Sequence, residues 1–247
     1  MYTERYVAFA DILGFSDIVK MSAQDSSPRR HDALVKALAE AGSHHPSLNE
    51  SDDFQFQTFS DSIVMSSAST PTGLIHILAS MADLSIRLLR DGLLIRGAIA
   101  KGSLHHKQSI MFGPAFLEAY GIESKIAKYP RILLSREVHQ DFKKWEGGLK
   151  WPQIRFAEDG PPFLHVFARF GMLNEGQPTI DFLNSPEVLD GQQCQRSIQN
   201  LLDAAIYEPS HYEKLRWLAI YWNGTVAHGV GRALERIILP VSRNIQC

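Results

Sequence analysis

The first hundred residues alternate between strand-like and helix-like hydrophobic patterns. Tyr6 to Asp11 is rich in β-forming residues, and Phe54 to Thr58 alternates apolar and polar positions with the period of two that is typical of a strand. Ser62 to Met65 is another short apolar run. The polar break before it predicts a hairpin with Asp61 at or beside the turn.

Helical patterns separate these strands and follow them. The clearest is an apolar stripe from Leu74 to Leu88, with Thr72 in front of it and Gly92 behind it. A shorter stripe covers Leu34 to Ala41. The pattern then predicts a buried strand over Leu93–Ala100 and a short apolar segment over Ile110–Phe112. A helix that begins with a proline follows over Pro114–Lys125. The last two elements are a strand over Arg131–Leu134 and a helix over Arg136–Lys144, capped by Ser135.

The order of these elements predicts the fold class. A strand, helices, a strand hairpin, a helix and a strand make the βαββαβ order of a ferredoxin-like domain, an α/β sandwich, which we place in residues 1–150. Residues 151–247 begin with two more strand-like pieces, Ile154–Ala157 and Phe163–Arg169, and continue as a mainly helical extension. Its helices are expected over Val188–Tyr207 and Tyr212–Asn223, the second stopped by Asn223-Gly224.

This topology predicts that two distant carboxylates meet. In a ferredoxin-like sheet the first strand runs antiparallel to the third, so its carboxyl end lies beside the turn that joins the second and third strands. Asp11 is at that strand end, and Asp61 is at that turn. One or two carboxylates together with substrate phosphates are the ligands that Mg²⁺ commonly uses. Backbone N–H groups at Gly14 and Phe15, before the next helix, are placed to hold phosphate oxygens.

Composition and charge narrow the function classes. Hydrophobic residues make up 45% and charged residues 21% of the 247 residues, and the formal net charge is −2. A chain without a basic excess lacks the electrostatic footprint of nucleic-acid-binding proteins. No signal peptide pattern follows Met1, and no apolar run approaches the length of a membrane span, so we expect a cytoplasmic bacterial protein without a membrane partner. Cys194 and Cys247 are expected to be reduced, and the adjacent His105 and His106 lack the spacing of a zinc site.

Five segments resemble the motifs of one enzyme family, the class III adenylyl and guanylyl cyclases. They match, in order, the F-x-D-I-x-G-F, T-x-G-D, R-x-G-I-x-x-G and W-G-x-x-V-N-x-A-x-R-x-E patterns and the closing strand: Phe9–Phe15, Thr58–Asp61, Arg96–Gly102, Phe112–Glu123 and Arg131–Ser135. Ser60 stands in place of the glycine of the second motif. The first motif is fairly specific, and the others gain weight from their order and spacing.

The resemblance implies an activity and a set of site residues. Asp11 and Asp61 would ligate two divalent metal ions, Mn²⁺ or Mg²⁺, and the Ile12 carbonyl would complete one of the two sites. The reaction would be attack of the ribose 3′-oxygen on the α-phosphate of a nucleoside triphosphate, giving a 3′,5′-cyclic nucleotide and pyrophosphate. In this family the active sites lie at a two-fold dimer interface, so a homodimer is expected. Phe15 and Ser16 are expected to contact the nucleotide.

Departures from the purine-specific pattern indicate a pyrimidine substrate. Gln57 stands where purine cyclases carry the Lys or Glu that reads the base, and Ile110 stands where they carry an Asp or Cys. Leu117 and Gly121 replace the Asn and Arg that steady the transition state. With a lone cyclase-like domain and a tail rich in Tyr and Trp, the chain resembles the pyrimidine cyclases of Pycsar anti-phage defence, which make cyclic UMP or cyclic CMP. UTP is favoured over CTP only because uridylate cyclases are the commoner branch.

Because Gly121 replaces the family's transition-state arginine, the residue that stabilises the negative charge of the transition state has to be sought elsewhere in the chain. Arg96 is our choice as the catalytic cation, and Lys101, Lys125 and Arg131 are further basic residues in or near the matched region. The alternatives are a degenerate cyclase-like dimer that binds nucleotide and signals, an adenylyl or guanylyl cyclase, and another ferredoxin-like palm enzyme. A diguanylate cyclase would carry a G-G-D/E-E-F turn, which Phe59 to Ile63 does not resemble.

Overall fold

The chain forms two compact units, Met1–Val166 and Phe167–Cys247. The computed structural model describes residues 1–24, 32, 35–36, 39, 53–107, 110–145, 152–171, 186–226 and 234–239. Most of the helix that the sequence predicts over Leu34–Ala41 lies outside these residues.

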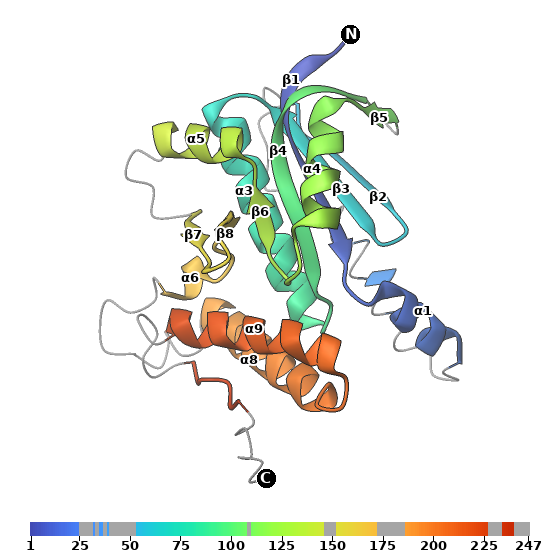
Figure 1. Ribbon diagram of the computed structural model, residues 1–247, viewed down its shortest axis with the longest axis vertical. Coiled ribbons are helices and arrows are strands. Elements are labelled where there is room, and N and C mark those ends of the chain that lie inside the picture. The colour runs from blue at the N-terminus through green and yellow to red at the C-terminus, as the bar shows by residue number, and fades with distance from the viewer. Residues whose placement is uncertain are drawn as a thin grey trace. The chain divides into compact units, whose positions relative to one another are not determined.

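The described part of the first unit is built on an eight-stranded sheet. Its strands run in the order β2-β3-β1-β4-β6-β8-β7, and β5 pairs with the far end of β4 (Figure 1). Their bounds are β1 Thr3–Ile12, β2 Gln55–Phe59, β3 Ser62–Ala68, β4 Ile95–Lys107, β5 Ile110–Phe112, β6 Ile132–Leu134, β7 Ile154–Phe156 and β8 Pro162–Leu164. β1 is antiparallel to both β3 and β4. The order β2-β3-β1-β4 with this polarity is the ferredoxin-like arrangement, so the predicted fold class is confirmed.

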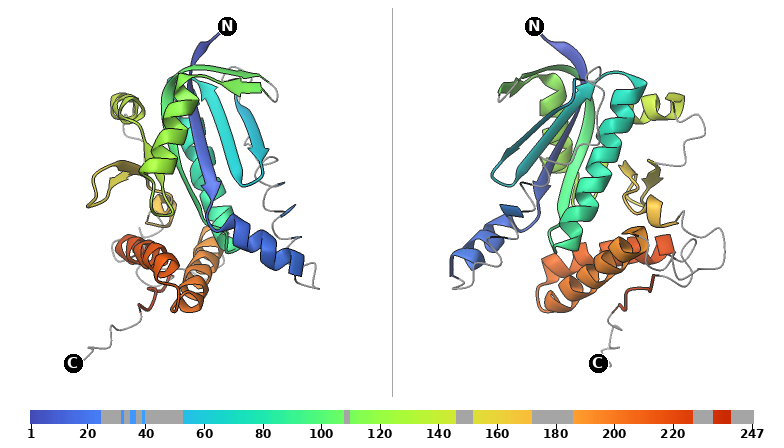
Figure 2. Two further views of the ribbon diagram at one scale, coloured as in Figure 1. Left: turned by 45° about the vertical axis from the view of Figure 1, so that its right-hand side comes forward. Right: turned by 180° about the vertical axis from the view of Figure 1, so that it is seen from behind.

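Helices cover both faces of the sheet because the residues of β1 alternate between two buried sides. Tyr6 and Ala8 face helix α3 (Pro71–Arg90), and Ser67 on that side donates a hydrogen bond from its Oγ to the Gly73 carbonyl, 2.8 Å away. Val7 and Phe9 form a buried cluster on the other side with residues of helix α4 (Pro114–Lys125). Figure 2 shows the two helices on opposite sides of the sheet.

Two further helices belong to this unit. α1 (Phe15–Gln24) leaves the carboxyl end of β1 and extends away from the sheet (Figure 1). α5 (Arg136–Trp145) is capped as the sequence predicts, since the Val138 N–H donates to Ser135 Oγ. The helix is tied to the sheet by Asp141, which accepts hydrogen bonds from Tyr6 and from Lys101 at 2.7 and 2.8 Å.

The centre of the sheet depends on one close approach between backbones. A Cβ built on Gly97 of β4 would lie 2.4 Å from the Phe9 carbonyl oxygen of β1. A side chain is therefore excluded at this position, which explains the glycine in the segment Arg96–Gly102.

The second unit contains α6 (Ala168–Gly171), α8 (Pro186–Ala204) and α9 (Pro209–Val226). Its core is aromatic, because the fully buried Trp222 contacts the rings of Phe167 and Phe170. α9 does not stop at Asn223-Gly224 as the sequence predicts. The Asn223 side chain instead exchanges two hydrogen bonds with the backbone of Ile237, so it serves a tertiary contact within the helix.

Three other expectations are corrected by the structure. The strand predicted over Phe163–Arg169 ends early, and its last residues form α6. The cap of α3 is Thr70, whose hydroxyl accepts from the Gly73 N–H, and Thr72 lies inside the helix. α3 is also long and apolar enough, by length and composition alone, to cross a membrane, although 61% of its most apolar window is buried within the protein.

The β2–β3 turn predicts the effect of a glycine substitution. Ser60 is the first of the two turn residues and has φ +57°, a left-handed conformation that costs a residue with a Cβ about 1 kcal/mol. We expect Ser60→Gly to raise the free energy of unfolding by about 0.5–1 kcal/mol, measured by urea denaturation. Ser62→Gly, in the adjacent strand β3, is the matched control and should lower it. A destabilised Ser60→Gly protein would contradict the assignment of strain to this turn.

Candidate active site

The structure brings Asp11 and Asp61 together at one end of the sheet. The antiparallel pairing of β1 with β3 sets Asp11 opposite Ser62, the residue after Asp61. The Ile12 N–H donates a hydrogen bond of 3.1 Å to the Asp61 backbone carbonyl, which fixes the turn against the end of β1. The Asp61 carboxyl group is close enough for its negative charge to act directly on Asp11. Two residues fifty positions apart therefore form one acidic site.

The electrostatics of this pair oppose ionisation of both groups. Burial is the largest cause that raises the pKa of Asp11, to about 7, and the negative charge and hydrogen bond of Asp61 add to it. The Asp11 side chain is only 24% exposed, so water screens the repulsion weakly. The nearby Arg96 guanidinium acts in the opposite direction and is outweighed.

A third carboxylate, which the sequence analysis did not select, completes the cluster. Glu123 of α4 is 3% exposed, and its Oε1 lies 2.7 Å from Arg96 Nε. Arg96 in turn lies 3.9 Å from Asp11. Burial raises the pKa of Glu123, the Arg96 charge lowers it, and the Asp61 charge raises it further. Glu123 shares the buried side of α4 with Ala115 and Ala119, at helical spacing, and an acid in an apolar helix stripe is the signal that identifies such a residue.

The donor set fits a divalent cation. Asp11, Asp61 and Glu123 carry three negative charges when ionised, against the single positive charge of Arg96. Among the described residues, no group of three or more His, Cys, Asp or Glu side chains is placed to hold a metal ion by itself. Two carboxylates fit an ion that keeps part of its water and takes its remaining ligands from substrate phosphates.

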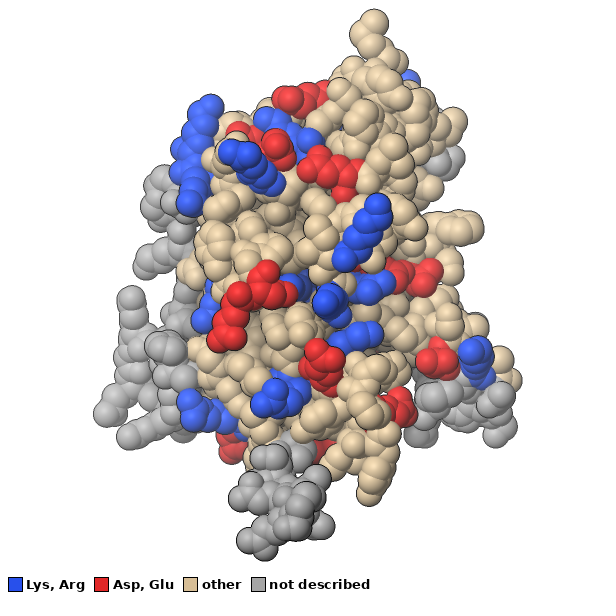
Figure 3. Space-filling model, in the orientation of Figure 1, with Lys and Arg blue, Asp and Glu red and all other residues tan. Residues whose placement is uncertain are grey.

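This acidic excess is local. Over the face drawn in Figure 3, acidic and basic side chains are interspersed, with no extended area of one sign. The formal net charge of the whole chain is only −2. A cation would therefore be drawn to this end of the sheet by the nearby carboxylates and not by a general negative field.

The residues after Asp11 begin a helix beside the carboxylates. Gly14 has φ +74° and accepts hydrogen bonds from the N–H groups of Asp17 and Ile18, so α1 starts at Phe15. The first N–H groups of a helix have no partner within it, and Phe15 and Ser16 therefore present donors suited to phosphate oxygens. Phe15 is half-buried, and Ser16 is exposed.

The two expected base-reading residues occupy different places. Gln57 lies on β2 opposite Val64, half-buried, two positions along the ladder from the row that holds Asp11. Ile110 is exposed on β5 and pairs with Lys107 at the far end of β4. At about 3.3 Å per residue, this end is roughly 36 Å along β4 from Arg96, which pairs with Asp11. The structure therefore does not bring Ile110 to the carboxylates of its own chain.

Of the four basic candidates, Arg96 is beside the carboxylate pair. Lys101 is bound by Asp141 through an ion pair of 2.8 Å. Arg131 is buried and donates from Nη1 to Asp159 at 2.7 Å. Lys125 is exposed in the last turn of α4.

Comparisons with known proteins give likenesses in structure only. No protein-family model matches the chain, and no curated protein matches its sequence. The monomeric guanylyl cyclase domain of the RhoGC fusion protein from the aquatic fungus Blastocladiella emersonii is 16% identical, with a TM-score of 0.48, over 66% of this chain and 95% of that one.

Two other solved structures give similar values. The catalytic core of a rhodopsin-guanylyl cyclase with converted specificity, in complex with ATPαS, is 17% identical, with a TM-score of 0.46, over 66% of this chain and 96% of that one. The adenylate/guanylate cyclase/hydrolase from Silicibacter pomeroyi is 16% identical, with a TM-score of 0.39, over 66% of this chain and 95% of that one. These likenesses concern the chain architecture and not the site residues.

The repulsion at the acidic site predicts a stability that depends on pH. The folded pKa of Asp11, about 7, is above its ordinary value of 3.8, so this group destabilises the metal-free fold as the pH rises through that window. We expect Asp11→Asn to raise the free energy of unfolding at pH 8 by roughly 1–2 kcal/mol and to change it little at pH 4. Urea denaturation of metal-free protein at both pH values is the measurement.

The exposed Asp17 supplies the control for that experiment. Asp17→Asn removes a carboxylate from the first turn of α1, where its side chain is 64% exposed. It should show no gain in stability at pH 8. An equal effect of Asp11→Asn at both pH values would show that the Asp11 carboxylate is not strained by its neighbours.

Proposed function

We propose that this chain is a class III nucleotidyl cyclase that converts a nucleoside triphosphate into a 3′,5′-cyclic nucleotide and pyrophosphate. The observation that carries the proposal is the placement of Asp11 beside the turn that holds Asp61, at the end of β1, where a cation is needed to offset two like charges. A phosphate-suited helix start follows directly at Phe15. The motif order over the first unit supports the same reading.

Each residue of the site has a distinct task in this proposal. Asp11 and Asp61, with the Ile12 carbonyl, would hold two Mn²⁺ or Mg²⁺ ions, which supply activation of the 3′-oxygen and neutralisation of the phosphate charge. Asp11 acts in its deprotonated form. The N–H groups of Phe15 and Ser16 orient the phosphates.

Arg96 is the catalytic cation of the proposal, and Glu123 positions it. The 2.7 Å contact with Glu123 holds the guanidinium beside Asp11, where negative charge develops on the transferred phosphate. Glu123 approaches Nε of the guanidinium and Asp11 approaches Nη2, and the buried Glu123 carboxylate restricts the rotamers of Arg96, so the charge is preorganised.

A pyrimidine triphosphate, UTP or CTP, is the proposed substrate. Ile110 offers an exposed hydrocarbon where purine cyclases are expected to carry an Asp or Cys, and it has no group to pair with a purine. Gln57 has a neutral amide where they carry a charged reader. A polar group missing from the site removes the hydrogen bond that would select a purine.

A homodimer with shared active sites completes the proposal. Ile110 is roughly 36 Å along β4 from the carboxylates of its own chain, so a second copy is needed to bring that strand to them. Phe59, Leu117 and Tyr120 are exposed apolar residues on the α4 side of the sheet, the side that carries Asp11. Buried between two copies, they would supply the apolar centre of an interface.

The biological setting follows from the resemblance to Pycsar cyclases. A cyclic pyrimidine nucleotide released in the bacterial cytoplasm would be a second messenger that activates an effector during phage infection.

A second function, nucleotide binding without turnover, is favoured by one observation on α4. Leu117 is 66% exposed, and a Cβ built on Gly121 would touch nothing within 4 Å, so neither residue replaces a transition-state Asn or Arg. A degenerate cyclase-like dimer would keep the fold and lose the chemistry.

A product assay separates these two functions. We expect the protein, offered ATP, GTP, CTP and UTP separately with Mn²⁺ or Mg²⁺, to form one cyclic pyrimidine nucleotide that chromatography and mass spectrometry identify. Removal of metal with EDTA should abolish the product. Asp11→Asn and Asp61→Asn should each lower turnover by about a hundredfold or more, because each removes charge that the metals need.

Asp83→Asn is the matched control for that assay. This Asp lies on α3, on the opposite face of the sheet from the carboxylate pair, and pairs with Arg87. It should leave turnover unchanged. No cyclic product from any of the four nucleotides, in the presence and absence of phage, would decide for the non-catalytic dimer.

The shared site predicts that a charge on α4 disrupts both association and activity. Leu117→Arg places a cation in the proposed interface and should shift the protein from dimer to monomer in sedimentation, with loss of turnover. Leu189→Arg, at an exposed leucine of the second unit, is the control and should leave both unchanged. A fully active Leu117→Arg monomer would exclude a site shared between two chains.

A further inference from the structure

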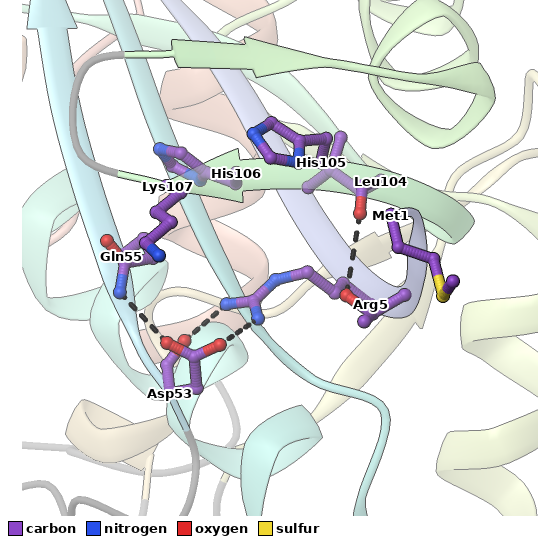
Figure 4. A pocket seen from close by; sticks show the side chains of 9 residues that line it. Met1, Arg5, Asp53, Gln55, Leu104, His105, His106 and Lys107 are labelled. Carbon is purple, nitrogen blue, oxygen red and sulfur yellow. Dashed lines mark hydrogen bonds and ion pairs between the residues drawn. The ribbon is translucent and has the colours of Figure 1, made fainter.

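A polar pocket lies at the end of the sheet opposite the acidic site. It has a volume of about 580 Å³ and is lined by the amino end of β1, the start of β2 and the carboxyl end of β4 (Figure 4). Arg5 belongs to its lining and is six residues before Asp11 on the same strand, or about 20 Å away. The volume is within the usual range of small-molecule sites. The function proposed above assigns no role to the residues that line the pocket.

The pocket is built around a buried arginine. Arg5 is 4% exposed, and its Nε donates to Ser66 Oγ at 3.1 Å. One Nη donates to the Asp53 carboxylate at 2.5 Å, and the other donates to the Asp53 backbone carbonyl. A guanidinium has five N–H groups, so two of them make no hydrogen bond with the described residues. The guanidinium is fixed in place and keeps spare donors.

The acidic residue of the pocket is already engaged. Arg5 donates to Asp53 Oδ2, and Gln55 Nε2 donates to Asp53 Oδ1 at 2.9 Å, as the dashed lines of Figure 4 show. Asp53 therefore balances the charge of Arg5. A ligand finds few free acceptors in the lining.

His106 adds a buried donor. Its Nδ1 lies 2.8 Å from Ser66 Oγ. Because that hydroxyl accepts from Arg5, it is free to donate to Nδ1, which assigns the proton of the imidazole to Nε2. His106 is 7% exposed, and its buried Nε2 has no hydrogen-bond partner among the described residues. Burial, followed by the Arg5 charge, lowers the pKa of His106 to about 4, which agrees with a neutral ring.

Lys107 gives the side chains that line the pocket a net positive charge. It is exposed at the pocket rim, and it has no ion-pair partner in the part of the chain that the structure describes. The Arg5 and Asp53 charges cancel, and His106 is neutral, so Lys107 is left over. Donors from three side chains then face a lining whose one carboxylate, Asp53, is already engaged.

We propose that this pocket binds a small molecule through a phosphate or carboxylate group. Such a group supplies the acceptors and the negative charge that the spare Arg5 donors, the His106 Nε2–H and the Lys107 ammonium lack. Within one chain the site is distinct from the acidic end of the sheet, which in the absence of metal ions would repel the same ligand.

The test is a titration of metal-free protein, prepared by chelating resin because a soluble chelator is itself a polycarboxylate. Inorganic phosphate, acetate and uridine 5′-monophosphate are added at constant ionic strength, with chloride as reference. The imidazole signals of His106 in long-range ¹H–¹⁵N spectra should shift in a saturable way. The signals of His165, another buried histidine of the same unit, should not move.

Variants at the rim make the result specific. Lys107→Ala should weaken binding about threefold, and Lys107→Glu should abolish it, whereas Lys107→Arg should retain it. Lys143→Ala, at an exposed lysine of α5, is the matched control and should bind as the wild type does. Saturable shifts with phosphate or the monophosphate assign a phosphate ligand, and shifts with acetate assign a carboxylate.

Two outcomes would overturn the proposal. One is the absence of saturable shifts at His106 with all three probes. The other is equal weakening by Lys107→Ala and Lys143→Ala, which would reduce the effect to general screening. Neither outcome touches the cyclase proposal, because turnover is assayed separately and depends on Asp11 and Asp61.

Discussion

Repulsion between two carboxylates held close together is the constraint on which this site depends. The β1–β3 ladder places Asp11 beside Asp61, and burial keeps water from screening them. Folding thus works against the preference of like charges to separate, and the unfavourable energy appears as the raised pKa of Asp11. Arg96 is the nearest offset, but Glu123 shares it. Only an added cation, or a proton, satisfies the arrangement.

The same strand carries opposite chemistry at its two ends. Arg5 and Asp11 are six residues apart on β1, an even number, so both side chains lie on the α4 side of the sheet. At the Asp11 end hydrogen-bond acceptors are in excess, and at the Arg5 end hydrogen-bond donors are in excess. The buried cluster that Val7 and Phe9 make with α4 separates them. A single strand can therefore support two sites of opposite sign without charge compensation between them.

The local elements that could be predicted are those whose signals are contained in a short stretch of chain. The alternation of β2, the proline start of α4 and the serine cap of α5 each lie within a few residues, and the structure has all three. Ser60 was recognised as a departure from glycine, but its left-handed φ follows from the two-residue turn that β2 and β3 impose. The continuation of α9 through Asn223 was missed because Ile237, its hydrogen-bond partner, is distant in sequence.

The sequence by itself determined the order of the strands of the βαββαβ core and its helices α3 and α4, and with them the meeting of Asp11 and Asp61, because strand polarity in such a sheet follows from the order of its elements. Only the tertiary structure decided which charges pair. Arg96 reaches Glu123, and Arg5 reaches Asp53, across elements whose side-chain directions no local pattern specifies. Hydrophobic period is a property of neighbouring residues, whereas ion pairing depends on three-dimensional distance, and that is set once the sheet and helices have packed.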